Sequence, residues 1–334
     1  MLNTIKTLTA VRAISGREKA VSDKLLKLIA PHVDNVRSDA MGSLIAFKKG
    51  TGKDGERKSR MLCAHMDEIG FLVTFIDDNG YLRIAPIGGI NFVAAAYSLV
   101  EFANGTKGIL VPESGTAPAD LRAEKFYIDI GAKDKKEAEK KVKIGDYCAV
   151  EGRVERLAGK RIAGRPLDDR IGCAMLIKIA EALKDSPCED DVYFVFSVQE
   201  EVGVRGARTA AYGIDPDSAL CFDVTGTGDA IGSKPMACSV GGGAAIKIKD
   251  ASVICDVEIT EQLLSLAKEQ GIKHQCEILL HGGTDTSAIQ GSRAGVRAGA
   301  ISIPTRYIHS GLEMLDLNDV QACISLTLAW LGAK

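Results

Sequence analysis

The chain has 334 residues, of which 46% are hydrophobic and 26% are charged, a composition typical of a globular protein and not of a disordered, collagen-like or coiled-coil chain. Its 42 Lys and Arg residues nearly balance its 44 Asp and Glu residues, so no bulk positive field exists to attract nucleic acid or an anionic membrane. The length exceeds that of one typical domain and predicts two domains, or one domain with a large insertion.

The first 66 residues indicate an α/β start. Apolar residues at helical spacing predict a helix over residues 20–29, which Pro31 ends. Short apolar runs predict strands at residues 44–47 and 61–64.

From about residue 69 to residue 159, short apolar runs alternate with Gly, Asn and Asp turn signals, which is typical of a small β-rich domain. A stretch rich in Lys and Glu predicts a solvated helix over residues 132–142. The expected strands are residues 71–76, 81–84, 99–102, 108–111, 126–130 and 147–150.

After Gly164 helices and strands alternate again, which favours an α/β fold with a mixed, largely parallel sheet flanked by helices. We therefore expect one discontinuous α/β domain, residues 1–67 and 160–334, with an inserted β-rich domain at residues 68–159. The expected helices are residues 169–184, 204–212, 258–270 and 318–331, and the expected strands are residues 192–198, 219–224, 245–249, 275–280 and 299–303.

Membrane and export signals are not evident in the sequence. The longest apolar stretch, residues 92–100, is far shorter than the roughly 20 residues of a membrane-spanning helix, and the N-terminus lacks the apolar core of a signal peptide. The nine cysteines are an odd number with no CxxC spacing, which fits neither a disulfide framework nor a zinc knuckle. We expect a cytoplasmic protein without nucleic-acid or membrane partners.

Side chains of the metal-ligand type follow the expected strands or precede an expected helix. Ligands of open α/β sheets bind outside the carboxyl ends of the strands, so these side chains are candidates for one shared site. His nitrogens with carboxylate oxygens suit zinc, cobalt or manganese, and a pair of such ions needs a bridging carboxylate with one or two further ligands each. The candidates are His65, Asp168, Glu200, Glu201, Asp223 and His309.

Two of these positions also have a neighbour with a candidate role. His65 and Asp67 point to the same side of an extended segment, so Asp67 can accept the second imidazole proton. Glu200 and Glu201 are adjacent, so one can bind metal while the other acts as a general base.

Each candidate alone also fits a plainer interpretation. A single His is often a core or surface residue, Asp168 can cap the helix that follows it, paired glutamates often lie in a solvated loop, and Asp223 fits an ordinary turn. Their shared position at strand ends, beside Gly-rich turns, supports the metal site, but the pattern alone leaves both interpretations open.

Six motifs, in this order and spacing, resemble those of the tetrahedral aminopeptidases, the family of glutamyl and deblocking aminopeptidases within the co-catalytic dinuclear metallopeptidases. The resemblance spans nearly the whole chain. The motifs are residues 64–70 (AHMDEIG), 166–172 (PLDDRIG), 198–203 (VQEEVG), 222–224 (FDV), 282–285 (GGTD) and 306–310 (RYIHS).

The resemblance implies a role for each matching residue. Asp168 would bridge two divalent ions, zinc or cobalt with manganese as a further candidate. His65 and Asp223 would complete one ion's site, and Glu201 and His309 the other's. Glu200 would be the general base and Asp67 the carboxylate that orients His65. The resemblance also implies a non-proline cis bond between Asp168 and Asp169. The expected substrate-binding residues are Gly282, Gly283, Thr284 and Asp285.

The insertion resembles the family's dimerisation domain at residues 126–132 (FYIDIGA), which implies dimers and a tetrahedral dodecamer. Three stretches depart from the family pattern. Residues 241–244 lack its Lys and Pro, Thr286 replaces its Ala, and residues 91–100 lack its Pro and Gly. The first two departures bear on which first residue of the substrate is preferred, and the third bears on the oligomer.

The resulting hypothesis is a metal-dependent aminopeptidase that removes N-terminal residues from short peptides, with a metal-activated water and Glu200 as general base. The alternatives are a cellulase-like glycoside hydrolase with paired carboxylates and a non-catalytic assembly protein. The aromatic content of 5% with one tryptophan, Trp330, offers little surface for stacking sugars and disfavours the glycosidase.

Overall fold

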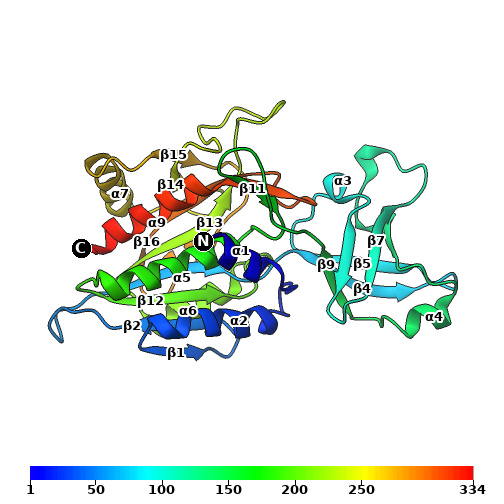
Figure 1. Ribbon diagram of the computed structural model, residues 1–334, viewed down its shortest axis with the longest axis horizontal. Helices are drawn as coiled ribbons and strands as arrows, with labels where there is room; N and C mark the ends of the chain where they lie inside the picture. The colour runs from blue at the N-terminus through cyan, green and yellow to red at the C-terminus, as the bar shows by residue number, and fades with distance from the viewer. Residues whose placement is uncertain (334) are drawn as a thin grey trace.

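The computed structural model describes residues 1–333 and has two parts, a helix-flanked sheet and a small separate barrel (Figure 1). Strands β4 to β9 of the barrel lie between the strands of the sheet in the chain order. Within the described residues, no helix has the length and apolar character needed to cross a bilayer.

The sheet has eleven strands; it is parallel at its centre and mostly antiparallel around it, except that β14 and β15 pair in parallel at one edge. The central strands pair in parallel in the order β12 (Asp191–Ser197), β3 (Ser59–His65), β13 (Ser218–Thr225) and β16 (Arg297–Arg306). Around them lie β1 (Asn35–Ser38), β2 (Leu44–Lys48), β10 (Glu155–Arg156), β11 (Arg161–Gly164), β14 (Ala244–Lys249), β15 (His274–Ile278) and β17 (Glu313–Asp316).

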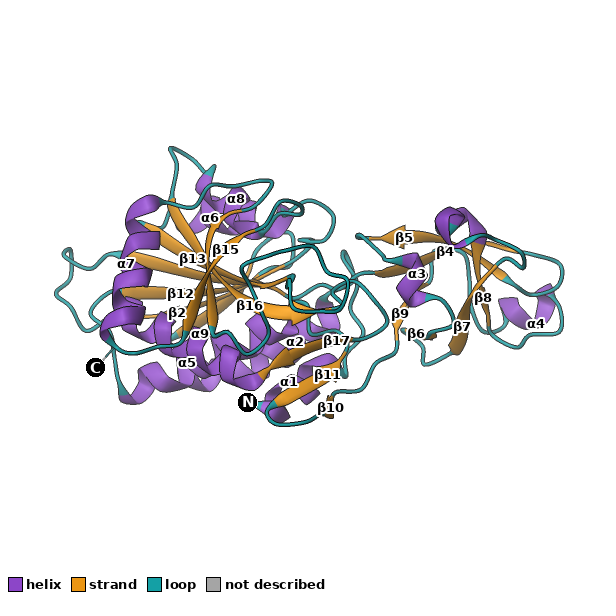
Figure 2. Ribbon diagram, turned by 90° about the horizontal axis from the view of Figure 1, so that it is seen from above, coloured by secondary structure: helices purple, strands orange, loops and turns teal. Residues whose placement is uncertain are grey.

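Helices cover both faces of this sheet (Figure 2). Strand β3 shows why: Leu62 and Ala64 pack into the core on one face, while Met61 and Cys63 pack into the core on the other, as alternation along a strand requires. The larger core includes side chains of α1 (Leu2–Thr9), α2 (Lys19–Ile29), α5 (Arg170–Asp185), α7 (Val257–Glu269) and α9 (Leu317–Leu331), and the smaller one those of α6 (Arg205–Ile214) and α8 (Asp285–Gln290). The predicted mixed α/β fold is confirmed.

The barrel closes in the order β4, β5, β8, β7, β6, β9 and has its own apolar core, centred on residues such as Phe71, Phe102 and Phe126. All six strands expected in this stretch are present. The bounds are β4 (Gly70–Ile76), β5 (Leu82–Ile87), β6 (Leu99–Phe102), β7 (Lys107–Pro112), β8 (Phe126–Asp129) and β9 (Tyr147–Val150), with α3 (Phe92–Ala95), α4 (Lys135–Glu139) and short 3-10 turns at Pro118–Asp120 and Ala123–Lys125. A further 3-10 turn, Ala30–His32, follows α2 in the α/β part.

Among the differences from the sequence-based expectations, two concern the stretch assigned to the insertion. The helix expected over residues 132–142 is only α4, because Asp134 caps its first turn and the chain leaves the helix after Glu139 to bury Val142 in the barrel core. Strand β10 lies inside the stretch assigned to the insertion, yet it pairs with β11 of the sheet. The chain therefore returns to the sheet before residue 160.

Candidate metal centre and active site

The predicted ligands meet at the carboxyl ends of the central parallel strands. His65 is the last residue of β3 and pairs in register with Ser197, the last residue of β12, so Glu200 and Glu201 follow at the same edge. Asp223 lies near the end of β13, and Asp168 lies in the loop before α5. His309 follows β16.

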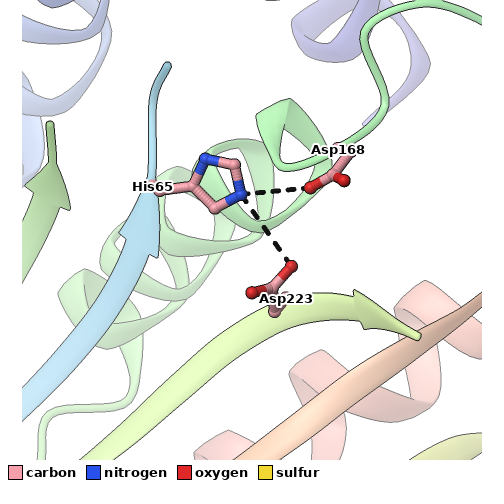
Figure 3. A group of neighbouring side chains, drawn as sticks. All are labelled: His65, Asp168 and Asp223. Carbon is pink, nitrogen blue, oxygen red and sulfur yellow. Dashed lines mark hydrogen bonds and ion pairs between the residues drawn. The ribbon is translucent and has the colours of Figure 1, made fainter. Parts of the chain in front are cut away.

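The first ligand group consists of His65, Asp168 and Asp223, whose side chains point toward one another (Figure 3). Nε2 of His65 lies 3.0 Å from Oδ1 of Asp168 and 3.9 Å from Oδ1 of Asp223. All three residues are buried. They come from three elements far apart in the sequence, so only the fold brings them together.

The second group shares Asp168. Its other oxygen, Oδ2, lies 3.2 Å from Nε2 of His309, and the same nitrogen lies 3.3 Å from Oε2 of Glu201. In each group the potential ligand atoms lie within 4.8 Å of one another. One oxygen of Asp168 thus faces each imidazole, which is the arrangement that a carboxylate bridging two cations requires.

The electrostatics of this cluster also fit bound cations. Burial disfavours charge on both imidazoles, but bonds to Asp168 together with those to Asp67 and Glu201 outweigh it, so the pKa of His65 lies well above its ordinary value and that of His309 rises to about 11. Burial raises the pKa of Asp223 well above its ordinary value, and repulsion from Asp168 acts in the same direction. Divalent cations would relieve this crowding of buried acids.

Asp67 is buried directly behind the candidate ligands and accepts hydrogen bonds from three donors. Its Oδ1 accepts from the backbone N–H of Glu200 at 3.1 Å and lies 3.4 Å from Nδ1 of His65. Its Oδ2 accepts from the Ser15 hydroxyl at 2.6 Å and from the N–H of Glu201 at 3.2 Å. This carboxylate therefore links the predicted ligand His65 to the loop that carries both glutamates.

Asp168 is held by residues that sequence reasoning did not identify. The buried carboxylate of Glu313 accepts from the N–H groups of Leu167 and Asp168, at 2.6 and 3.1 Å. Arg165 donates to Glu313 at 3.2 Å and to the carbonyl of Ser310 at 2.8 Å, next to His309. No local sequence signal marks Glu313, because β17 is too short to show a pattern. The implied cis bond between Asp168 and Asp169 is present.

Glu200 lines the same pocket as the ligands and is not needed to complete either group. Burial raises its pKa well above the ordinary value, with attraction to His65 opposing and repulsion from Asp223 adding to this shift. Such a raised pKa suits a group that must take up and release a proton near neutral pH.

The pocket at this edge has a volume of about 440 Å³. Of the four predicted substrate-binding residues, Gly282, Gly283 and Thr284 line it. Asp285 does not: it is buried at the start of α8 and bonds to the Ser197 hydroxyl and, at 3.6 Å, to the Cys63 thiol. Its placement beneath the strand ends indicates a structural contact rather than one with substrate.

Fold and site together define a metal-dependent hydrolase built on a mixed α/β sheet. The chain belongs to the M42 glutamyl aminopeptidase family, whose model matches residues 42–326. It is an aminopeptidase, and the family uses divalent metal ions.

Solved structures and a curated relative agree with this assignment. An aminopeptidase from the archaeon Desulfurococcus kamchatkensis has a TM-score of 0.94 and 37% identity, with 98% of this chain and 93% of that chain covered. The Pyrococcus horikoshii TET1 peptidase, titled as assembling into a tetrahedron or a large octahedral shell, has a TM-score of 0.88 and 32% identity, covering 99% and 98%. The lysyl aminopeptidase of Pyrococcus furiosus is 32% identical over 95% of this chain and 93% of its own length. The comparisons favour the aminopeptidase hypothesis over the glycosidase and non-catalytic alternatives.

Proposed function

We propose that this aminopeptidase hydrolyses the first peptide bond of short peptides with two divalent ions that share Asp168. His65 and Asp223 would complete one site, and Glu201 and His309 the other. The observation that carries the proposal is the placement of Asp168, whose two oxygens lie 3.0 and 3.2 Å from the two different imidazoles. The mixed nitrogen and oxygen donor set favours zinc or cobalt, with manganese as a further candidate.

The bound ions would supply an activated water nucleophile and polarise the scissile carbonyl. Glu200 would accept the proton of that water and return it to the leaving amine, because its carboxylate lines the pocket without completing either ligand group. Asp67 would be a positioning residue that orients the His65 ring through Nδ1 and fixes the backbone of Glu200 and Glu201.

The peptide would enter the pocket past Gly282, Gly283 and Thr284. Backbone without bulky side chains at two of these positions leaves room for the substrate main chain. A pocket of about 440 Å³ accommodates the first residues of a peptide and not a folded protein.

The division into an α/β catalytic domain and an inserted dimerisation domain is part of the same proposal. The barrel has a core of its own and presents the exposed apolar side chains of Val93, Tyr97 and Leu99, which favours a role in self-association. We propose dimers joined through the barrel and a tetrahedral dodecamer, by analogy with the TET1 peptidase. All nine cysteines are unpaired, which supports a location in the reducing cytoplasm.

The test is Glu200→Gln, which keeps the shape of the side chain and removes its basicity. Hydrolysis of leucine p-nitroanilide by the metal-loaded variant should fall about 10²- to 10⁴-fold in kcat, the usual size of a general-base contribution, while elemental analysis still finds two ions per chain. Glu139→Gln, at an exposed position of α4 in the barrel, is the matched control and should keep full activity. A Glu200→Gln variant with undiminished kcat would contradict the general-base role.

A further inference from the structure

The lining of the active-site pocket is uncharged outside the catalytic centre. Charged side chains in it are confined to the five proposed metal ligands and Glu200. No Lys or Arg contributes to the lining among the described residues. The remaining residues are uncharged: Gly89, Gly203, Val204, Val224, Thr225, Gly226, Ser252, Leu279, Gly282, Gly283, Thr284, Ser287 and Ile308.

Two cations on neighbouring segments, Lys247 and Arg306, are engaged elsewhere. Lys247 is buried behind the pocket in an ion pair with Glu277. Arg306 makes two bonds to Asp229, at 3.0 and 2.6 Å. Both positive charges therefore already have a carboxylate partner and are poorly placed to pair with an acidic substrate side chain.

Arg205 lies near the mouth of the pocket, with its Nε 3.9 Å from the position that a Cβ on Gly203 would take. Its side chain is exposed and bonds to the amide oxygen of Gln199 at 3.4 Å. A cation in this solvated position would interact only weakly with a side chain inside the pocket.

Asp250, the carboxylate directly behind the lining residues Ser252 and Thr284, is also occupied by hydrogen bonds. Asp250 accepts from the N–H and hydroxyl of Ser252, at 2.7 and 2.8 Å, and from the N–H of Val253 at 2.9 Å. Its other oxygen accepts from the Thr284 hydroxyl at 3.3 Å and lies 3.7 Å from Nζ of Lys247. Among the described residues, no acid outside the catalytic centre is left in the pocket lining to pair with a Lys or Arg side chain of a substrate.

Building on the proposed function, we infer that the pocket selects peptides whose first side chain is uncharged. Both a carboxylate and an ammonium group would lose water on entry and find no opposite charge beyond the catalytic centre itself, and a buried unpaired charge is costly. An aliphatic or amide side chain meets Val224, Leu279 and Ile308 together with the hydroxyl groups of Ser252 and Thr284. The preference thus differs from the glutamyl activity in the family's name and the lysyl activity in the name of the Pyrococcus furiosus relative.

Pairs of amino-acid p-nitroanilides with side chains of similar size separate the effect of substrate charge from the effect of substrate size. Gln and Glu have the same shape, and Met and Lys have similar lengths. On the metal-loaded protein, kcat/KM should be more than tenfold higher for Gln than for Glu and for Met than for Lys. A ratio below tenfold in either pair overturns the inference while leaving the aminopeptidase mechanism intact. If none of these four substrates is hydrolysed, and leucine p-nitroanilide is not hydrolysed either, the proposed function itself is overturned.

A positive charge introduced into the pocket lining gives an independent test. Leu279 lines the pocket beside Gly282, whereas the next residue, Leu280, is 72% exposed and outside the lining. Leu279→Arg should raise the Glu-to-Gln ratio of kcat/KM at least tenfold, and Leu280→Arg, which adds the same charge, should leave it within twofold. Equal ratios for two folded variants would overturn the inference, and the wild-type substrate pairs decide the question alone if Leu279→Arg does not fold.

Discussion

Replacement of Asp67 by Asn tests how the site is organised, because it changes no proposed metal ligand. The carboxylate contacts four donors: the Ser15 hydroxyl, the N–H groups of Glu200 and Glu201, and the ring of His65. Asn keeps the shape but has one acceptor oxygen and one donor nitrogen. In either orientation its NH₂ group faces a backbone N–H that cannot turn away.

The expected losses of stability and of metal affinity follow from these contacts. If the amide oxygen takes the place of Oδ1, the Ser15 hydroxyl can rotate and accept from the NH₂ group, but the N–H of Glu201 has no acceptor. In the reverse orientation the N–H of Glu200 has no acceptor. Loss of one buried bond to a charged group costs about 1.5–3 kcal/mol. Loss of the carboxylate behind a metal-binding His lowers metal affinity about 10- to 100-fold.

Two assays measure these effects separately. Urea unfolding of the metal-free protein should show a stability loss of about 2 kcal/mol for Asp67→Asn, and titration of zinc against a competing chelator should show the weaker affinity. Ser15→Ala is the control, because it removes only the 2.6 Å bond to Oδ2 and should change zinc affinity less than threefold. Unchanged zinc affinity in Asp67→Asn would refute the orienting role of Asp67.

Three further predictions concern stability and metal. Glu313→Gln leaves one of its three donors, the N–H groups of Leu167 and Asp168 or the Arg165 guanidinium, without an acceptor, so we expect a loss of about 2–4 kcal/mol in urea unfolding; a loss below 0.5 kcal/mol would contradict it. The Arg306 guanidinium lowers the pKa of Asp229 to about 2, so this pair stabilises the fold above the ordinary Asp pKa and its contribution is lost as the pH falls toward 2. Because this pair is solvent-exposed and screened, Asp229→Asn should cost less than the full pKa shift implies, about 1 kcal/mol at pH 7. Thermal melts should show that cost shrinking between pH 4.5 and pH 3, and a cost that does not change with pH would contradict the prediction. Binding of zinc at about 100 times its Kd should stabilise the chelated protein by about 2.7 kcal/mol, and a melting temperature that does not respond to zinc would exclude folding-coupled binding.

The sequence predicted the parts of the structure that have a local signature. The apolar run at residues 61–64 and the proposed ligand His65 that follows it indicated a buried strand with a functional end. The alternation of Leu62 and Cys63 between two cores explains why that run is apolar throughout. The parallel pairing of β3, β12 and β13 then brings the ends together, as the rule for α/β sheets predicts. The assignment of individual ligands rested on the family resemblance and not on pattern alone.

Long-range contacts could not be predicted, because contacts between residues far apart in the sequence produce no periodic pattern in it. Glu313 supports Asp168 across 145 positions, and Ser15 bonds to Asp67 across 52. Strand β10 is two residues long, too short for any alternation to appear. The family resemblance suggested a substrate contact for Asp285, but its side chain lies beneath the strand ends and bonds to Ser197.

The central claim is that Asp168 bridges two divalent ions. Anomalous diffraction from crystals grown with zinc, recorded on both sides of the zinc absorption edge, tests this most directly. Two strong peaks should appear, one among His65, Asp168 and Asp223 and the other among Asp168, Glu201 and His309. A single peak, or two peaks that do not share Asp168 as a ligand, would contradict the account.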